Sequence, residues 1–581
     1  MARPRPINKN REYPSIDARI KQTYIAESTA QKTKLYDMYA RFFRWASDRL
    51  AADGVLAFVT NRSFIESRTF DGFRKTVTQE FSEAYIVDLG GDVRANPKLS
   101  GTRNNVFGIQ TGVAISFFVK RHGAAVKKQG CRVFYARRPE METAEEKLAW
   151  LGSSRPSGQR FEEVRPDRSG NWLNLSTNDF DQLIPVANKQ SKGATRPGSE
   201  QAIFKLFSLG YVTARDDWMT DWDIATLGRK VHRFCDVFDQ ERRRWNAAGR
   251  PKDIANFVNR EIKWTSELEA RLARGTEFVF DHRLIVGSLY RPFAKKFLYF
   301  TEALTHRRYQ LPSVFPAPKR ANLAITFLSI ISSWPLSALG TDVPFDYCLL
   351  KQGNGATQSL PLWSYASDGT RSDNITDWAL AKFQKHYQPG RGRKAQPITK
   401  EAIFHYVYAV LHDPLYREKY AQNLKREFPR IPLYGESDAT FWQWAGWGAE
   451  LMALHIGYET VEPFALTRTD VPDEKVRAAG QSPKPSLKAD KEAGRIVVDS
   501  ETTLAGVPAS AWRYLLGNRS AIEWVLDQHK EKKPKDPTIR EKFDTYRFAD
   551  HKERVIDLLA RVTTVSVETM RIVDSIRLGP R

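Results

Sequence analysis

The sequence predicts an α/β protein in which a partial sheet is followed by a mixed α/β region and a mostly helical C-terminal part. Three observations support this. The run 55–60 is apolar throughout, which is typical of a strand buried on both faces of a parallel sheet. A helical pattern at 69–81 then leads to a second apolar run at 84–89, so the three segments form a βαβ unit. Beyond residue 400, apolar residues recur at helical spacing.

The N-terminal elements follow one another in a readable order. Apolar residues recur three and four apart over 35–50, which predicts an amphipathic helix before the first strand. The second strand stops at Gly90-Gly91. A third strand at 113–119 is reached through a polar segment without helical period, so we expect it to run antiparallel to the others. Three strands leave a bare sheet edge, and we expect further strands from elsewhere to pair with it.

Length and charge bound the function. A chain of 581 residues should hold more than one domain. The net charge of +22 predicts a polyanionic partner, with nucleic acid as the first candidate and a generally basic surface as the alternative. Three scattered cysteines fit neither a disulfide framework nor a zinc site, and no apolar run is long enough to span a membrane. We therefore expect a cytoplasmic protein.

Composition divides the chain into six segments. Ser, Gly and Pro gather near 152–158, which marks a boundary, and polar, charged residues interrupt the helical pattern after 466. The expected segments are a basic leader at 1–34, a sheet-bearing domain at 35–151, a mixed α/β region at 160–395, a helical region at 400–466, a linker or insertion at 467–495, and a C-terminal helical segment at 496–581.

Several short phrases, in a fixed order along the chain, carry a family resemblance. They are similar to the second half of the adenine-specific DNA methyltransferase module, and the regions that follow it, in single-chain type ISP restriction-modification proteins and their relatives in phage defence. The phrases are LYDMY at 35–39, FRWA at 43–46, DLGGDVRANPK at 88–98, NVFGIQTGVA at 105–114, TARD at 213–216, YRPF at 290–293, FHYVY at 404–408, PRIP at 429–432 and SAIEWV at 520–525.

The resemblance implies a fold and a function. It assigns 35–151 to the C-terminal half of a class I, Rossmann-like methyltransferase fold, which the antiparallel third strand also suits. It assigns 160–395 to a target recognition region for double-stranded DNA. The complete enzyme would transfer a methyl group from S-adenosyl-L-methionine to N6 of adenine. The alternative is a non-catalytic DNA-binding specificity subunit or a decayed fragment.

Two motifs of the family are missing. The family holds its cofactor on a glycine-rich strand-to-helix turn and grips the target adenine with Asn-Pro-Pro-Tyr or Asp-Pro-Pro-Tyr. The nearest look-alikes, 87–91 and 96–99, lack the following helix and the second proline with its aromatic ring, respectively. We therefore expect no catalytic, cofactor-binding or metal-binding residue in this chain, and an upstream polypeptide that supplies the first half of the fold.

The mixed region holds the candidate DNA-binding residues. A guanidinium fork held by a neighbouring carboxylate is suited to donating two bonds to guanine, although such a pair also anchors turns. Lysines and arginines that alternate with aromatic residues are suited to contact with a nucleic-acid backbone, although lysines that flank a buried strand give the same pattern. The candidates are Arg215, Asp216, Tyr290, Arg291, Lys295, Lys296, Arg307 and Arg308.

Three histidines in the helical region, His405, His412 and His455, have no nucleophile and no metal-ligand spacing beside them. We interpret them as helix-packing or capping residues.

Overall fold

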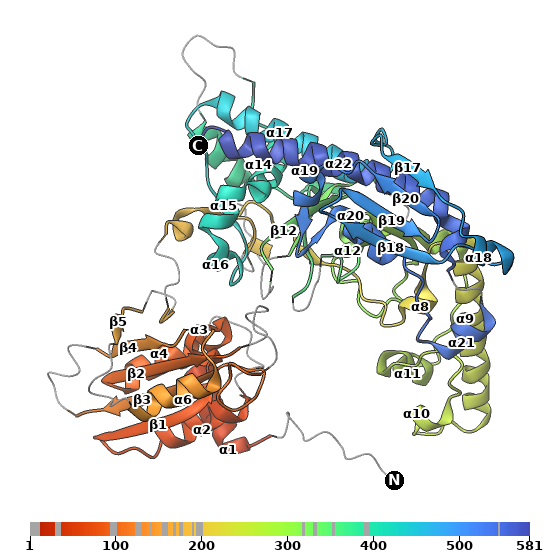
Figure 1. Cartoon of the computed structure of the whole chain (residues 1–581). Coiled ribbons are helices and arrows are strands. Elements are labelled where there is room, and N and C mark those ends of the chain that lie inside the picture. Colours follow the sequence, from red (N-terminus) through yellow and green to blue (C-terminus); the bar gives the residue numbers. More distant parts are fainter. Residues whose placement is uncertain are drawn as a thin grey trace. The chain divides into compact units, whose positions relative to one another are not determined.

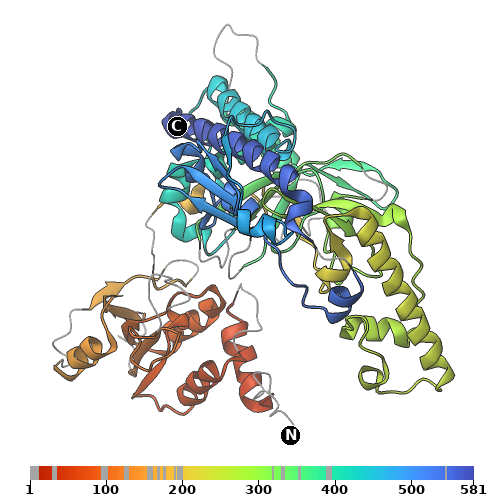
Figure 2. The ribbon, with the colours of Figure 1, turned by 45° about the vertical axis from the view of Figure 1, so that its right-hand side comes forward.

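The computed structural model divides the chain into two compact units, Met1–Thr177 and Asn178–Arg581 (Figures 1 and 2). It describes residues 12–28, 36–92, 102–122, 130–139, 141–153, 161–166, 170–173, 178–188, 191–192, 201–316, 320–328, 334–350, 355–387, 396–543 and 546–581.

The N-terminal unit is a five-stranded mixed sheet with helices on both faces (Figure 1). The strand order is β1-β3-β2-β4-β5; β3 runs antiparallel to both β1 and β2, β2 runs parallel to β4, and β5 runs antiparallel to β4. The elements are α1 (Pro14–Ile20), α2 (Met38–Ser47), β1 (Gly54–Asn61), α3 (Ser63–Glu66), α4 (Asp71–Glu80), β2 (Glu83–Gly90), β3 (Val113–Lys120), β4 (Arg132–Arg137), α6 (Ala144–Ser153) and β5 (Glu162–Val164).

The core of this unit is aromatic. Phe43 on α2, Phe73 on α4 and Phe118 on β3 are fully buried and meet with ring centroids 5.1 to 6.4 Å apart. On the opposite face of the sheet, α6 contributes Trp150 and Leu151 to a smaller cluster over β2 and β3. The sheet therefore has its main core on one face and a minor one on the other.

The outer strand β1 differs from the expectation for 55–60. Leu56 faces the core, but Val55 and Val59 are 59% and 52% exposed, so the strand is buried on one face only. On the neighbouring α2, Phe42 and Trp45 are also about half exposed. The prediction that both faces of this strand are covered within the chain is therefore wrong.

Two further differences concern the extent of this unit. The stretch 121–138, where the sequence predicts no strand, contains β4, which pairs in parallel with β2. The boundary between the units lies after Thr177 rather than near 152–160, because β5 extends the first sheet and Trp172 and Leu173 are buried in its core. The antiparallel direction expected for the strand at 113–119 is confirmed.

The C-terminal unit is a mixed α/β structure with three described cores. The first core lies between the sheet β12-β11-β13-β7 and the helices α13, α14 and α17. The elements are β6 (Ile184–Pro185), β7 (Ser208–Leu209), β11 (Ala324–Leu328), β12 (Ser337–Thr341), β13 (Gln358–Pro361), β14 (Trp363–Tyr365), β15 (Arg371–Asp373), α13 (Asp377–His386), α14 (Lys400–His412), α15 (Pro414–Lys419), α16 (Ala421–Leu424), β16 (Arg430–Ile431) and α17 (Asp438–Ile456).

The second core lies beneath a four-stranded antiparallel sheet of order β17-β20-β19-β18. Ser520 caps one of its helices, and Glu523 completes a capping box with it. The elements are α12 (Leu311–Val314), β17 (Thr467–Asp470), α18 (Glu474–Ala478), β18 (Pro485–Asp490), β19 (Arg495–Asp499), β20 (Thr502–Ala505), α19 (Ala509–Arg513), β21 (Leu515–Leu516), β22 (Arg519–Ser520), α20 (Ala521–Gln528) and α22 (Lys552–Leu578). The stretch 467–495, expected to be a linker or insertion, instead supplies β17, β18 and the start of β19 to this sheet.

The third core belongs to a lobe built on the long helix α9 (Figures 1 and 2). Trp218, Phe234 and Phe238 are fully buried in it, together with Ile539 from a segment some 300 residues later. The elements are α8 (Asp216–Met219), β8 (Thr220–Asp221), α9 (Ile224–Ala247), α10 (Ile254–Phe257), α11 (Ser266–Ala273), β9 (Ile285–Arg291), β10 (Ala294–Tyr299) and α21 (Pro537–Lys542).

Candidate nucleic-acid interface

Four of the eight candidate residues meet at the hairpin of β9 and β10. The Tyr290 hydroxyl donates a hydrogen bond of 3.1 Å to Asp216 Oδ2. The Arg291 guanidinium lies 4.1 Å from the centre of the Tyr290 ring. Lys296 Nζ lies 4.4 Å from the same ring centre. The structure therefore brings Asp216, Tyr290, Arg291 and Lys296 into one cluster.

Arg291 forms an ion pair with a residue that is distant in the sequence. Its Nη1 forms a salt bridge of 2.7 Å with Asp346 Oδ1, and Asp346 is buried. Burial opposes the charge on Arg291, but the attraction of Asp346 outweighs it and raises the pKa of Arg291. Burial raises the pKa of Asp346 to about 6. This value is still below neutral pH, so the carboxylate is ionised and pairs with the guanidinium.

Arg215 does not form the fork held by Asp216 that the sequence suggests. Its guanidinium is buried and donates instead to the Leu304 carbonyl at 3.3 Å and to Thr265 Oγ1 at 2.9 Å. Burial lowers the pKa of Arg215 to about 10. The hydroxyls of Thr213 and Tyr290 donate to the Asp216 carboxylate. In this structure Arg215 joins α8 to the start of α11 and presents no free donor at the surface.

The two lysines of β10 point to different partners. Lys296 Nζ lies between the rings of Tyr290 and Trp222, 4.4 and 4.8 Å from their centres, and burial lowers the pKa of Lys296 to about 8. Lys295 Nζ pairs with Glu459 Oε2 at 2.9 Å. Lys296 is thus a partly enclosed cation, and Lys295 has a carboxylate partner.

Arg307 is the exposed cation of the set. Its side chain has no ion pair in the described part of the chain, whereas Arg308 pairs with Glu302 at 2.9 Å. The neighbouring Tyr309 is exposed and has a φ of +49°, in the left-handed region that favours glycine. Its ring stacks on that of Tyr347 with centroids 6.3 Å apart. The side chain of Arg307 also hydrogen-bonds with Tyr309, which raises the pKa of Arg307. Arg307 and Tyr309 therefore form an exposed pair of a cation and an aromatic ring on this loop.

The sequence pointed to the loop of Arg307 and Tyr309 because basic and aromatic residues lie side by side at 306–309. It gave no sign of Tyr347, which stacks on Tyr309 from 38 positions away, or of Asp346. These two partners lie at 346–347, directly after a buried segment, and only the tertiary fold brings them to the hairpin and the loop.

The turn at 88–91, which ends β2, is the place where the N-terminal unit would have to hold S-adenosyl-L-methionine. Asp88 is fully buried and accepts bonds of 2.7 Å from Arg62 Nη2 and from the Tyr135 hydroxyl. Burial opposes its charge, but the bonds from Arg62 outweigh this and lower the pKa of Asp88. A Cβ atom on Gly91 would lie 2.7 Å from the Asn104 carbonyl oxygen. The chain itself fills this turn, so the residues present do not fit the cofactor; the look-alike at 96–99 lies outside the described residues.

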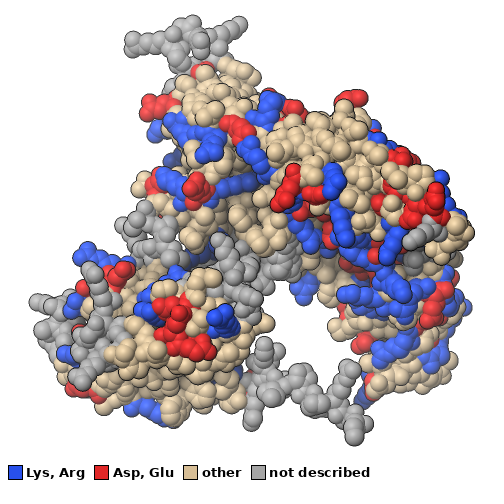
Figure 3. Space-filling model, in the orientation of Figure 1, with Lys and Arg blue, Asp and Glu red and all other residues tan. Residues whose placement is uncertain are grey.

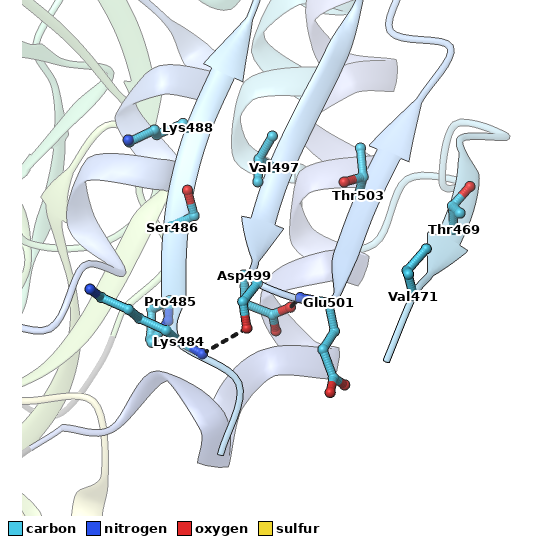
Figure 4. Close-up of a pocket in the computed structure, with 11 residues that line it drawn as sticks. Thr469, Val471, Lys484, Pro485, Ser486, Lys488, Val497, Asp499, Glu501 and Thr503 are labelled. Atoms are coloured by element: carbon cyan, nitrogen blue, oxygen red, sulfur yellow. Dashed lines mark hydrogen bonds between the residues drawn. The ribbon is translucent and has the colours of Figure 1, made fainter. Parts of the chain in front are cut away.

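Other site types find little support. The described residues contain no cluster of three or more His, Cys, Asp or Glu side chains arranged to hold a metal ion, and none of the described helices is long and apolar enough to cross a membrane. An open hollow of about 480 Å³ lies on the outer face of the β17-β20-β19-β18 sheet (Figure 4). Both acidic residues that line it form ion pairs, Asp499 with Lys552 at 2.7 Å and Glu501 with Arg477 at 2.9 Å.

Two of the three histidines expected to pack helices are buried between them, and His405 is half-buried. His412 and His455 are buried, and His455 Nε2 lies 3.0 Å from Thr569 Oγ1 and 3.1 Å from the Tyr514 hydroxyl. Burial lowers the pKa of His455 to about 3, with Arg417 adding to the effect. Both histidines are therefore neutral, packed residues.

Most of the C-terminal unit matches a known protein family. A family model described as "Type ISP C-terminal specificity domain" matches residues 202–558. No curated protein sequence matches the chain.

Solved structures are similar over nearly the whole chain. DrdV in a complex with DNA is 47% identical, with a TM-score of 0.82 over 97% of this chain and 55% of that one. A nuclease-deletion mutant of the type ISP restriction-modification enzyme LlaGI, in complex with a DNA substrate mimic, is 27% identical, with a TM-score of 0.75 over 98% of this chain and 50% of that one. The ATP-dependent type ISP enzyme LlaBIII, bound to DNA, is 26% identical, with a TM-score of 0.78 over 98% and 36%. The chain spans about half the length of the first two.

Proposed function

This chain belongs to the type ISP restriction-modification family through its C-terminal specificity domain, and from that premise we propose that it recognises a specific sequence in double-stranded DNA. The observation that carries the proposal is the match to the specificity domain over 202–558, together with solved relatives that were determined on DNA. The net charge of +22 supports it, because neutralising phosphates supplies much of the affinity of DNA-binding proteins.

The candidate residues around β9 and β10 fall into two groups, one that stabilises the fold and one that is exposed and could contact bases. Arg291 forms an ion pair with Asp346, and Arg215 donates hydrogen bonds to Leu304 and Thr265. These two arginines therefore stabilise the fold beneath the surface and are not available to DNA. Arg307 and Tyr309 are exposed, and Arg307 forms no ion pair among the described residues. A guanidinium without a carboxylate partner can turn to donate two hydrogen bonds to a guanine edge. Arg307 is therefore the base-reading candidate among the eight residues, with Tyr309 beside it as a stacking surface.

We further propose that the N-terminal unit is part of the methyltransferase fold of an enzyme that methylates adenine at N6. The complete enzyme would take the methyl group from S-adenosyl-L-methionine. The turn 88–91 does not fit this cofactor, so the cofactor site and the catalytic residues would come from another polypeptide or another part of a longer chain.

The outer strand β1 supports the existence of that partner. Val55 and Val59 leave one face of β1 exposed, and β1 pairs only with β3 among the described strands. On α2, which packs against the other face of β1, Phe42 and Trp45 are also about half exposed. An unpaired apolar edge is unfavourable in water. We propose that strands of the other half of the methyltransferase sheet pair with β1 and cover this surface.

Sequence recognition is tested by selection from a random duplex library with the purified chain. One enriched motif is the expected result. Equal recovery of all sequences, with binding that disappears at higher salt, would contradict a specificity function and leave a non-specific DNA-binding protein.

The methyltransferase part is tested by co-expressing the chain with a polypeptide that carries the glycine-rich cofactor turn and Asn-Pro-Pro-Tyr, and mapping N6-methyladenine in the host DNA. Methylation at the motif found by selection, only when both polypeptides are present, is expected. Selection of a motif without methylation would favour the alternative, a non-catalytic specificity subunit.

A further inference from the structure

The segment 530–542 is strongly basic and its position on the lobe is fixed. It contains six lysines and arginines and three acids. At its start, the ring of His529 stacks on Trp222 with centroids 4.5 Å apart. Further along, Asp536 Oδ2 accepts a bond of 2.7 Å from Trp218 Nε1, and Ile539 is buried in the core of the lobe. The loop that holds the lysines is therefore held at both ends against α8 and α9.

Two of the three acids of this segment are hydrogen-bonded within the chain, and four of its six cations form no ion pair among the described residues. Glu531 accepts a bond from the Phe548 amide at 2.7 Å, and Asp536 is occupied by Trp218 and the first turn of α21. Lys530, Lys533 and Lys535 are exposed and form no ion pair within the described residues. Like charges held close together repel one another, and a polyanion bound over them would relieve that repulsion.

The basic surface continues onto the lobe. Lys542 Nζ and Arg233 Nη2 both bind Glu261 Oε1, at 2.9 and 2.5 Å, so α21 lies against α9 and the segment before α11. Arg540 and Arg229 are exposed and form no ion pair in the described part of the chain. In Figure 3, lysines and arginines gather over the region where Figure 1 places α9 and α21.

The geometry points to a second DNA contact on this surface: Lys530, Lys533, Lys535 and Arg540 on the segment, with Arg229 on α9, bind the sugar-phosphate backbone that flanks the recognised sequence. This rests on the proposed function and adds to it. Exposed, flexible lysines without partners are point charges, suited to phosphates and not to reading base edges. The surface therefore supplies affinity without specificity.

Fluorescence anisotropy with the full chain, on one duplex that carries the selected motif and one that lacks it, tests this over a series of salt concentrations. The variant K530Q/K533Q/K535Q removes three charges from the surface. The matched control K382Q/K484Q/K488Q removes three exposed lysines, also without ion pairs, from α13 and from the outer sheet. K530R/K533R/K535R keeps the charge and tests whether charge alone matters.

Each lysine that binds a phosphate contributes about 0.9 to the slope of log Kobs against log salt concentration. The triple variant should therefore bind both duplexes at least about tenfold more weakly near physiological salt, with a slope shallower by roughly 2 to 3. The arginine variant should bind as the wild type does, and the ratio of the two affinities should stay constant.

A slope and affinity equal to those of the control would overturn this contact while leaving the proposed function intact. A change confined to the motif-bearing duplex would also overturn it, because it would assign these lysines to base reading. A wild-type chain that binds neither duplex would remove the proposed function itself, and this contact with it.

Discussion

At the scale of single residues, adjacency in the sequence was a poor guide to partnership in space. Arg215 and Asp216 are neighbours, yet Arg215 donates to Leu304 and Thr265 while Asp216 serves Thr213 and Tyr290. The carboxylate that does hold an arginine, Asp346, lies 55 positions from Arg291. Burial decided these outcomes, and a local pattern of charges carries no measure of burial.

The first prediction separates reader from scaffold. R307A should weaken binding of the selected motif by about 1 to 3 kcal/mol and relax the preference at one base, because an exposed guanidinium reads a base edge. Its melting temperature should stay close to that of the wild type. R291A should instead lower the free energy of unfolding by about 3 to 5 kcal/mol, because it leaves Asp346 buried and unpaired.

Anisotropy and thermal unfolding measured on the same samples check both effects. R308A is the control, since Arg308 already pairs with Glu302 next to Arg307. If R307A binds every duplex as the wild type does, the base-reading assignment is wrong.

The second prediction concerns pH. His455 is neutral in the folded chain, with a pKa lowered to about 3, whereas an unfolded histidine titrates near 6.5. The stabilising contribution is therefore complete above pH 6.5 and declines as the pH falls towards 3, by about 2 kcal/mol at pH 5. H455Q cannot take up the proton, so its free energy of unfolding should fall less steeply between pH 7 and 5.

Denaturant titrations at several pH values provide the comparison. Only the pH slope is diagnostic, because H455Q also loses contacts with Thr569 and Tyr514 and is less stable at every pH. Parallel curves for variant and wild type would contradict the prediction.

At the scale of elements, apolar periodicity located the helices and strands of the N-terminal unit well. It gave the helix before β1, the three strands β1 to β3 and the antiparallel direction of β3. It missed β4, whose apolar centre at Val133 and Tyr135 is flanked by arginines that dominate the composition. It missed β17 altogether, because every side chain of that edge strand is exposed and leaves no apolar pattern.

The third prediction concerns the uncovered face of β1. V55K/V59K places two charges where the proposed partner would bury two valines, each worth about 1.5 to 3 kcal/mol. The affinity for the polypeptide that supplies the other half of the sheet should fall at least about 100-fold. The chain alone should keep its melting temperature, because both side chains are already more than half exposed.

Biolayer interferometry with the immobilised partner measures the loss. T469K/T503K, on the open face of the β17-β20-β19-β18 sheet, is the control. An unchanged affinity for V55K/V59K would mean that the partner, if it binds, covers another surface.

At the scale of the whole molecule, the sequence indicated several domains but placed the main boundary too early. The glycine- and serine-rich passage near 152–158 has the composition of a linker, yet the chain returns to the first sheet as β5 and buries Trp172 before the second unit begins. In the second unit, α21 joins the lobe of α9 across some 300 residues. Contacts of that range leave no periodic signal in one sequence.

The fourth prediction tests whether the two units unfold separately. Leu559 on α22 is fully buried in the second core, and L559A should destabilise the C-terminal unit by about 2 to 5 kcal/mol. F73A should do the same to the N-terminal unit. Calorimetry should show two transitions, each variant lowering only one; a single transition that both variants shift would contradict independent units.

The helix α22 has a consequence for the order in which the chain becomes active during synthesis. Its residues Ile572 and Ile576 enter the first core of the C-terminal unit, while Val555, Leu559 and Val562 enter the second. Every other element of these two cores precedes it along the chain. The N-terminal unit can therefore fold while the rest of the chain is being synthesised, but the C-terminal unit stays incomplete until α22 has left the exit tunnel of the ribosome. Nascent chains stalled before residue 552 should consequently be open to proteases throughout the second unit, and the proposed DNA binding should appear only after α22 has emerged.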